Sequence, residues 1–161
     1  MTLATEQDLR QQLERARPLW GWALAARGHG EEGIIQIRQA LAADRSTGAT
    51  RDRPYNLALL AEASVQGGQT TEGLEALAEA LALLATSGVR WWEAELHRLK
   101  GELLDKTATV PSIVEACFQR AYTLAGAQHA KSLELRAAMS LSRFWQRQGK
   151  GEQARQLLAE T

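Results

Sequence analysis

The chain has 161 residues, of which 45% are hydrophobic and 24% charged, a composition that fits one globular domain and excludes a disordered chain. Its 19 basic and 19 acidic residues balance, so no overall field attracts nucleic acid or an anionic membrane. The single cysteine, Cys117, cannot form an internal disulfide, and residues 1–10 contain no apolar run for a secretory signal or a membrane span. We therefore expect a cytoplasmic protein without membrane contact.

Apolar residues recur at three- and four-residue steps in nearly every segment, which is the helical period. In chain order, this predicts a capping helix over residues 5–17 and a second helix over 18–27. The later helices are predicted over residues 31–43, 54–66, 71–85, 91–104, 112–124 and 132–148, with a last one through Leu157 and Leu158. Pro54 suits a first helical turn, and Ser112 with Glu115 has the pattern of a capping box.

Small residues return along the chain at spacings of 40 or 41 residues. Helices approach to about 8–10 Å only where a small residue meets a large one, so we expect Gly21 to face Ile37, and likewise in later pairs. The recurring small residues are Gly21, Ala61, Gly101 and Ser142, with a second set at Ala40, Ala80 and Ala121. The recurring large residues are Ile37, Leu77, Phe118 and Leu158, and turn glycines stand at Gly28, Gly68 and Gly149.

This self-similarity predicts an all-α fold, a right-handed α–α superhelix of about three and a half helix pairs with a period near 40. We expect a capping helix over residues 1–17 and a repeat domain over 18–161. Its repeats are predicted at about 18–52, 53–88, 89–130 and 131–161. We expect Cys117, Trp20, Trp91, Trp145 and Leu135 in the core, whereas Trp22 and Trp92 are left open between core and surface.

The alternation of small residue, turn glycine, second small residue (Gly33, Gly73, Ala154) and large apolar residue resembles the tetratricopeptide repeat in a stretched form. Val114 departs from the small-residue pattern of this repeat. The stretches 30–34, 53–55, 91–103 and 116–121 are also similar to the C-terminal repeats of large bacterial signalling proteins. In that family the repeats follow a nucleotide-cyclase or LuxR-type DNA-binding module and an ATPase module. The resemblance covers residues 19–158 and implies a regulatory repeat region without the family's catalytic residues.

Catalytic and cofactor patterns are weak in this sequence. The glycines near residues 67–71 and 149–152 lack the spacing of a phosphate loop, and we predict that they are turns. Cys117 has no base at helical spacing, and His29, His97 and His129 have no second ligand at metal-binding spacing. We therefore expect no enzyme activity, no metal and no cofactor. The competing enzyme hypothesis requires a site built from the turns, for instance His29 with Glu62 and Glu102.

If the helix pairs stack, the first helix of each pair lines a groove. The predicted groove residues are Trp22, Tyr55, Glu62, Glu95, Arg98, Glu102, Arg136, Met139, Arg143 and Gln146. Aromatic residues come first and charges follow, which suits a protein segment with an apolar end. The alternative is a solvated face with helix-spaced ion pairs among residues such as Glu95, Arg98 and Glu102.

The expected function is a non-catalytic protein–protein interaction scaffold, the regulatory or sensory region of a larger bacterial signalling protein. Its expected partners are a protein or peptide segment in the groove and other domains of the parent chain. Self-association is expected through the C-terminal edge at Leu157 and Leu158. Nucleic-acid binding through Arg136, Arg143 and Arg147 is a further alternative, as the regulatory domain of a transcriptional activator.

Overall fold

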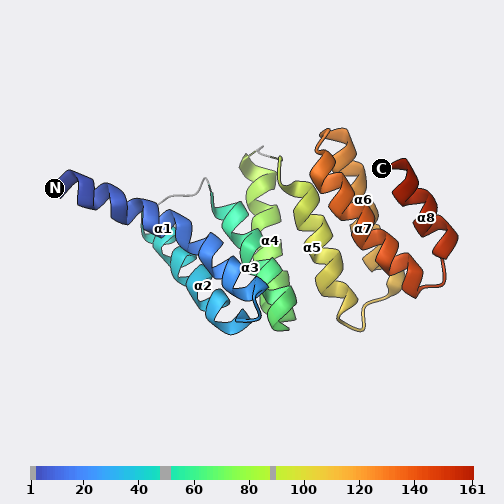
Figure 1. Cartoon of the computed structure of the whole chain (residues 1–161), viewed down its shortest axis with the longest axis horizontal. Helices are drawn as coiled ribbons and strands as arrows, with labels where there is room; N and C mark the ends of the chain where they lie inside the picture. The colour runs from blue at the N-terminus through green and yellow to red at the C-terminus, as the bar shows by residue number, and fades with distance from the viewer. Residues whose placement is uncertain (1–2, 48–51, 88–89) are drawn as a thin grey trace. The chain divides into compact units, whose positions relative to one another are not determined.

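The computed structural model describes residues 3–47, 52–87 and 90–161, with side chains over 12–43, 52–86 and 90–161. Within these ranges every regular element is an α-helix, so the all-α prediction is confirmed (Figure 1). The helices are α1 (Leu3–Ala26), α2 (Gly30–Thr47), α3 (Arg53–Gly67), α4 (Thr70–Ser87), α5 (Glu93–Asp105), α6 (Pro111–Ala127), α7 (Lys131–Arg147) and α8 (Gly151–Glu160). None of the described helices is long and apolar enough to cross a membrane.

The chain divides into two compact units, Met1–Ala80 and Leu81–Thr161, with the division inside α4. In the first unit, α1 packs against α2 and α3, and α2 also packs against α3. In the second unit, α5 packs against α6 and α7, and α7 packs against α6 and α8. Each unit therefore contains a contact between the first helices of successive pairs, α1 with α3 and α5 with α7.

The close approaches predicted at Gly21 and Gly101 are confirmed. A Cβ atom added to Gly21 would lie 2.8 Å from Ile37 Cγ1. One added to Gly33 would overlap the backbone oxygen of Gly21, so α1 and α2 touch through their backbones at this point. A Cβ on Gly101 would lie 2.5 Å from Phe118 Cε1. Glycine is therefore required where these helices cross, because any side chain would push them apart.

Glycine also ends three of the helices in the left-handed conformation. Gly68 has a φ of 72°, and its N–H donates to the Ser64 carbonyl. Gly28 and Gly149 have φ values of 94° and 76°, so the predicted glycine turns are confirmed. The turn between α6 and α7 uses His129 instead, with a φ of 53°. A histidine in this region is less favoured than glycine because of its Cβ.

The core of the second unit is built around two phenylalanines. Phe118 and Phe144 lie with ring centroids 5.9 Å apart, and Val114 and Leu141 complete the buried cluster. Val114 breaks the small-residue pattern and yet is buried, and the sequence pattern did not single out Phe144. Leu157 packs against this cluster, whereas Leu158 is exposed. The large apolar position predicted at Leu158 is therefore wrong by one residue.

Helix α1 is continuous through Pro18, where the sequence predicted two helices that met at residues 17 and 18. Proline inside a helix removes one backbone hydrogen bond and costs about 3 kcal/mol. Pro18 is fully buried, so the packing of α1 offsets this cost. The capping role and the predicted repeat boundaries stay predictions.

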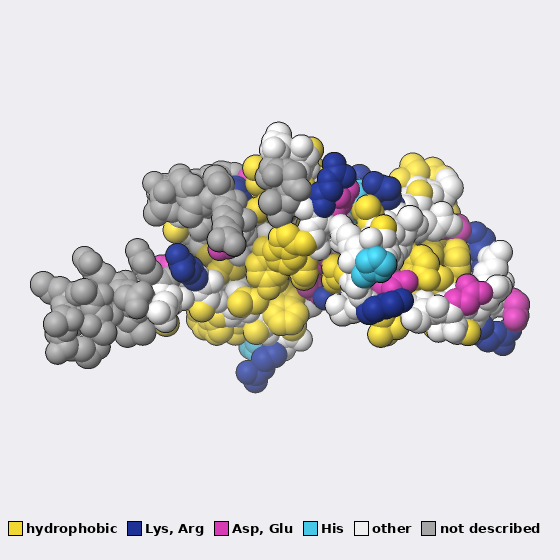
Figure 2. All heavy atoms as spheres, turned by 90° about the horizontal axis from the view of Figure 1, so that it is seen from above, with side chains coloured by type: hydrophobic (Ala, Val, Ile, Leu, Met, Phe, Trp, Pro, Cys, Tyr) yellow, Lys and Arg dark blue, Asp and Glu magenta, His cyan; other side chains and the backbone are white. Residues whose placement is uncertain are grey.

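Three residues predicted to be inside are exposed. Trp20 is 54% exposed because Pro18, Gly21 and Ala25 form the buried stripe of α1, and residue 20 lies off that stripe. Trp91 is 59% exposed because α5 begins only at Glu93 and leaves Trp91 in the preceding turn. Leu135 is also exposed, because it lies off the buried stripe of α7. Large hydrophobic side chains therefore form part of the surface, and Figure 2 shows hydrophobic side chains among charged ones on one face of the molecule.

The predicted capping box at Ser112 and Glu115 is wrong. Helix α6 begins at Pro111, its N-cap residue is Val110, and no side chain caps it. Pro111 supplies the start instead, because proline needs no backbone partner in the first turn. Glu115 is left to interact with other helices. Pro54 lies in the first turn of α3 as predicted.

Candidate functional site

The first unit presents an aromatic and acidic face where α1 meets α3. The Trp22 indole Nε1 donates to Glu62 Oε2 at 3.0 Å, across 40 residues of sequence. Tyr55 is half-buried on α3. Burial raises its pKa first, and the negative charge of Glu62 raises it further. Three predicted groove residues, Trp22, Tyr55 and Glu62, therefore lie together, and we call them the α1–α3 face.

The second unit carries a buried ion pair on α5. Glu95 is 1% exposed and Arg98 is 8% exposed. Arg98 Nη2 donates to Glu95 Oε1 at 2.7 Å, and Arg98 Nε donates to Glu95 Oε2 at 3.0 Å. This fork-to-fork geometry fixes both side chains and satisfies the desolvated carboxylate.

Two contacts from α7 extend this ion pair across the helices. Arg136 Nη2 lies 2.9 Å from Glu95 Oε1, across 41 residues of sequence. The Ser140 hydroxyl donates to Glu102 Oε1 at 2.7 Å, and Arg98 Nη1 lies 3.2 Å from that same oxygen. We call these five residues the α5–α7 cluster. The helix-spaced pairs of the alternative are present: the pair of Arg98 with Glu95 is buried, and the pair of Arg98 with Glu102 is partly buried. Contacts from α7 join both pairs to a second helix.

Other predicted groove residues reach the surface of α7. Met139, Arg143 and Gln146 are exposed. For Trp22 and Trp92 the sequence did not decide between core and surface, and both are half-buried. Trp22 donates a hydrogen bond to Glu62, and Trp92 packs against a buried apolar cluster. The sequence pattern did not identify Ser140, because a serine one position from the predicted stripe carries no signal by itself.

The residues named for the two alternative functions, an enzyme site and a nucleic-acid surface, have the following contacts in the structure. Of the residues in the enzyme hypothesis, His29 lies exposed in the turn after α1. Glu62 accepts a hydrogen bond from Trp22, and Glu102 accepts one from Ser140. For the nucleic-acid reading, Arg147 pairs with Asp105 on α5, just as Arg136 pairs with a carboxylate. Cationic groups already neutralised in this way are poor phosphate ligands.

One histidine and the cysteine are in environments that disfavour charge. Burial lowers the pKa of His97, which is half-buried on α5. Burial likewise raises the pKa of the half-buried Cys117, so its thiol is less nucleophilic than an exposed one. Within the described part of the chain, no group of three or more histidine, cysteine, aspartate and glutamate residues could hold a metal ion.

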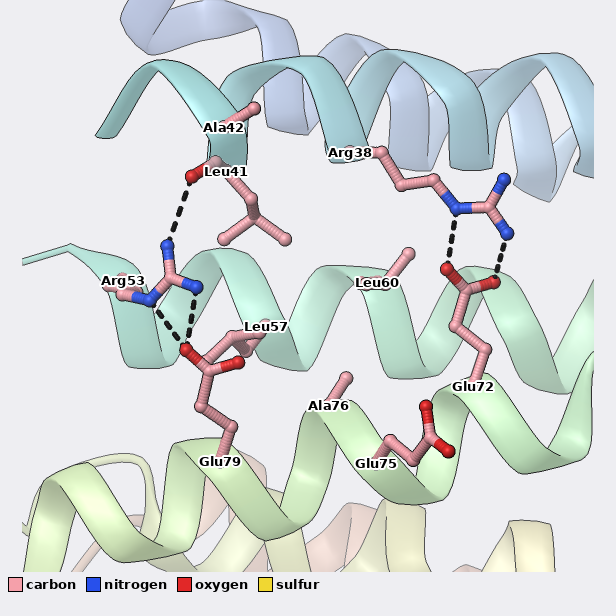
Figure 3. Close-up of a pocket in the computed structure, with 10 residues that line it drawn as sticks. All are labelled: Arg38, Leu41, Ala42, Arg53, Leu57, Leu60, Glu72, Glu75, Ala76 and Glu79. Atoms are coloured by element: carbon pink, nitrogen blue, oxygen red, sulfur yellow. Dashed lines mark hydrogen bonds and ion pairs between the residues drawn. The ribbon is translucent and has the colours of Figure 1, made fainter. Parts of the chain in front are cut away.

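A second feature, which the sequence pattern did not reveal, is an open hollow of about 260 Å³ between α2, α3 and α4 (Figure 3). Two ion pairs border it. Arg38 Nε and Nη2 donate to both oxygens of Glu72 at 2.5 and 2.6 Å. The buried Arg53 donates from Nε to Glu79 Oε1 at 2.7 Å and from Nη1 to the Leu41 carbonyl at 3.0 Å. The lining residues are Arg38, Leu41, Ala42, Arg53, Leu57, Leu60, Glu72, Glu75, Ala76 and Glu79.

One of these ion pairs has an equivalent in the second unit with the signs exchanged. Arg53 at the start of α3 pairs with Glu79 of α4 at 2.6 Å. Glu93, 40 residues after Arg53, lies 3.9 Å from Arg120, 41 residues after Glu79. The repeat spacing therefore preserves the position of a charge pair between a first and a second helix, although not its polarity.

Glu115 links three segments of the second unit. The Trp145 indole of α7 donates to Glu115 Oε1 at 2.8 Å, and Lys150 Nζ, just before α8, donates to Glu115 Oε2 at 2.8 Å. The hydrogen bond from Lys150 is the main cause that lowers the pKa of Glu115 below its ordinary value of 4.5, and the Trp145 bond adds to it.

A pH dependence follows from this lowered pKa. Because the folded state holds the charged carboxylate, its stabilisation is full above pH 4.5 and is lost as the pH falls through the lowered folded pKa. We expect Glu115→Gln to lower the free energy of unfolding by about 1 kcal/mol or less at neutral pH and by less still in strong acid. Urea unfolding over the acid range measures this. Glu152→Gln, at an exposed position, is the control, and a difference independent of pH would contradict the prediction.

No family model matches the chain, and no solved structure matches it. The chain is 30% identical over 121 residues to Uncharacterized protein R02095 of Rhizobium meliloti (strain 1021). The aligned segment makes up 75% of this chain but 12% of that protein. The chain thus spans a small part of the relative that it matches.

Proposed function

We propose that this chain is a non-catalytic protein-interaction domain that holds an extended or helical segment of a partner protein. The observation that carries the proposal is the meeting of first helices in each unit, which brings predicted groove residues together. Trp22 contacts Glu62 on the α1–α3 face, and Arg136 contacts Glu95 in the α5–α7 cluster. Both pairs are one repeat apart, as expected for stacked tetratricopeptide-like pairs in a right-handed superhelix.

The two faces differ in what they can bind. Half-buried aromatic rings on the α1–α3 face, Trp22 and Tyr55, offer an apolar anchor point beside the Glu62 carboxylate. On the second unit, Arg143 and Met139 are exposed on α7, the helix that joins the buried ion pairs. Aromatic and arginine contacts usually provide most of the energy of an interface. We therefore assign the aromatic residues to anchoring, and the buried charges to holding the helices that present them.

The cellular setting of the proposal comes from the resemblance to bacterial signalling proteins. In that setting the chain is a regulatory or sensory repeat region in the cytoplasm, and other domains of the parent chain are among its partners. The match to a much longer protein of Rhizobium meliloti supports a position within a larger chain. The exposed Leu158 near the end of α8 supports the predicted self-association at that edge.

The proposal is tested by selecting peptide ligands from a random library on the immobilised chain and measuring their affinity by fluorescence anisotropy. We expect Trp22→Ala to weaken a selected peptide by about 2 kcal/mol or more, roughly thirtyfold, because it removes an anchor. Arg143→Glu is the matching variant for the second unit.

The control for this experiment is Trp20→Ala, because Trp20 lies on the same helix but outside the α1–α3 face and is exposed. We expect it to leave the affinity unchanged. If Trp22→Ala and Arg143→Glu both bind every selected peptide as tightly as the wild type does, the first-helix faces are not the binding surface. A selective loss in Trp20→Ala would assign binding to the outer surface of α1.

A further inference from the structure

The hollow between α2, α3 and α4 is distinct from the first-helix faces, because the second helices α2 and α4 form its two sides (Figure 3). Its floor is apolar: the nearly fully buried Leu57 and Leu60 of α3 lie at its base. Ala76 on α4 contributes a small side chain next to them, which leaves room above the floor. The hollow can therefore accept an aliphatic chain in contact with apolar atoms.

The charges around the hollow are unequally matched. Two arginines and three glutamates line it, so its net charge is negative. Arg38 is neutralised by Glu72, and Arg53 by Glu79. Figure 3 shows Glu75 on α4 between these two pairs with no interaction drawn to it, and no described side chain forms an ion pair with it. The remaining charge is thus one exposed carboxylate beside an apolar floor.

We infer that this hollow binds a basic side chain, lysine or arginine, of a partner protein, with its charge paired to Glu75. Lysine and arginine carry an aliphatic stem below a charged head, so the stem fits the Leu57 and Leu60 floor while the head reaches the carboxylate at the rim. Arg38 and Arg53 also border the hollow and carry the same charge as the incoming side chain. Their repulsion of that side chain is reduced, because each arginine forms a close ion pair with a glutamate.

The volume of the hollow indicates that its occupant is a side chain of a protein rather than a free small molecule. Pockets that enclose a small ligand measure about 300–1,000 Å³ and cover most of its surface. This hollow measures about 260 Å³ and is open to solvent. It provides room for one side chain, and the rest of the binding energy must come from the surface of the protein that carries it. The inference adds a second contact surface to the proposed function and does not depend on the first-helix faces.

The test uses NMR spectra of the full chain with labelled leucine and alanine methyl groups. The probes are acetyl-Ala-Arg-Ala-amide and acetyl-Ala-Lys-Ala-amide, and the matched uncharged probe carries norleucine in place of the basic residue. We expect the basic peptides to shift the methyl signals of Leu57, Leu60 and Ala76 in a saturable way. We expect the norleucine peptide to bind about fivefold more weakly, the ratio that one exposed ion pair provides.

Two variants separate the Glu75 contact from a general effect of charge. Glu75→Gln preserves the shape of an exposed side chain, so it should fold normally and lose about the same fivefold affinity for both basic peptides. Glu32→Gln removes the charge of an exposed glutamate on α2 that lies outside the hollow, and it should bind as the wild type does. Equal shifts by the norleucine peptide, equal binding by Glu75→Gln, or shifts confined to residues outside the hollow would each overturn the inference.

Discussion

Replacing Gly33 with alanine is expected to destabilise the first unit, although alanine is the better helix former. The new Cβ would overlap the backbone oxygen of Gly21 and lie 2.9 Å from the backbone nitrogen of Ala25. These are backbone atoms, so no side chain can rotate away and α1 must separate from α2. Overpacking of this kind costs about 3 kcal/mol, against a gain of about 1 kcal/mol in helix propensity. We expect a net loss of about 2 kcal/mol in the free energy of unfolding, measured by urea titration.

The matched control is Gly151→Ala. A Cβ at Gly151 would have no neighbour within 4 Å, and its backbone is helical without a positive φ. This variant should be as stable as the wild type or slightly more stable, because only the helix propensity changes. If Gly33→Ala matches it, the crossing of α1 and α2 is looser than the contact of Gly33 with Gly21 indicates.

Replacing Arg98 with methionine is expected to have the largest effect in the second unit. The change leaves the Glu95 carboxylate, which is 1% exposed, without its bidentate partner and with only the contact from Arg136. Removing one member of a buried pair costs about 3–5 kcal/mol, because the other charge stays desolvated. Since Arg136 remains, we expect a loss of about 3 kcal/mol in the free energy of unfolding. Arg143→Met, at an exposed arginine on α7, should change stability by about 0.5 kcal/mol or less.

A double variant distinguishes an unpaired charge from lost packing. Adding Glu95→Leu to Arg98→Met removes both charges, so much of the loss should be recovered, by about 2 kcal/mol. Arg136 is partly exposed and can be hydrated after this change. If the double variant is less stable than Arg98→Met alone, the cost comes from packing or from the Ser140 and Glu102 contacts rather than from the buried Glu95 carboxylate.

The sequence predicted some members of the candidate site but not its chemistry. Counting from Gly21 at a 40-residue spacing placed Trp22 and Glu62 at equivalent positions, and the structure brings them into hydrogen-bonding contact. The same counting placed Glu95 and Arg136 among the groove positions, and the structure shows that they form an ion pair. It could not show that Glu95 and Arg98 are buried, because burial depends on how closely the neighbouring helix packs. The sequence pattern could not predict the hollow either, because the hollow depends on how three helices pack together.

The sequence by itself determined the helical class, the turns and the points where helices cross. These features depend on local rules: glycine at a positive φ, as at Gly68, and glycine where backbones touch, as at Gly33. The tertiary structure alone decided which way several other side chains point. One residue along a helix turns the side chain by about 100°, so Trp20 beside Gly21 faces solvent, and Leu157 rather than Leu158 packs into the core. Ion pairs between helices depend on this rotation as well. Two charged side chains form such a pair only when each lies on the side of its helix that faces the other.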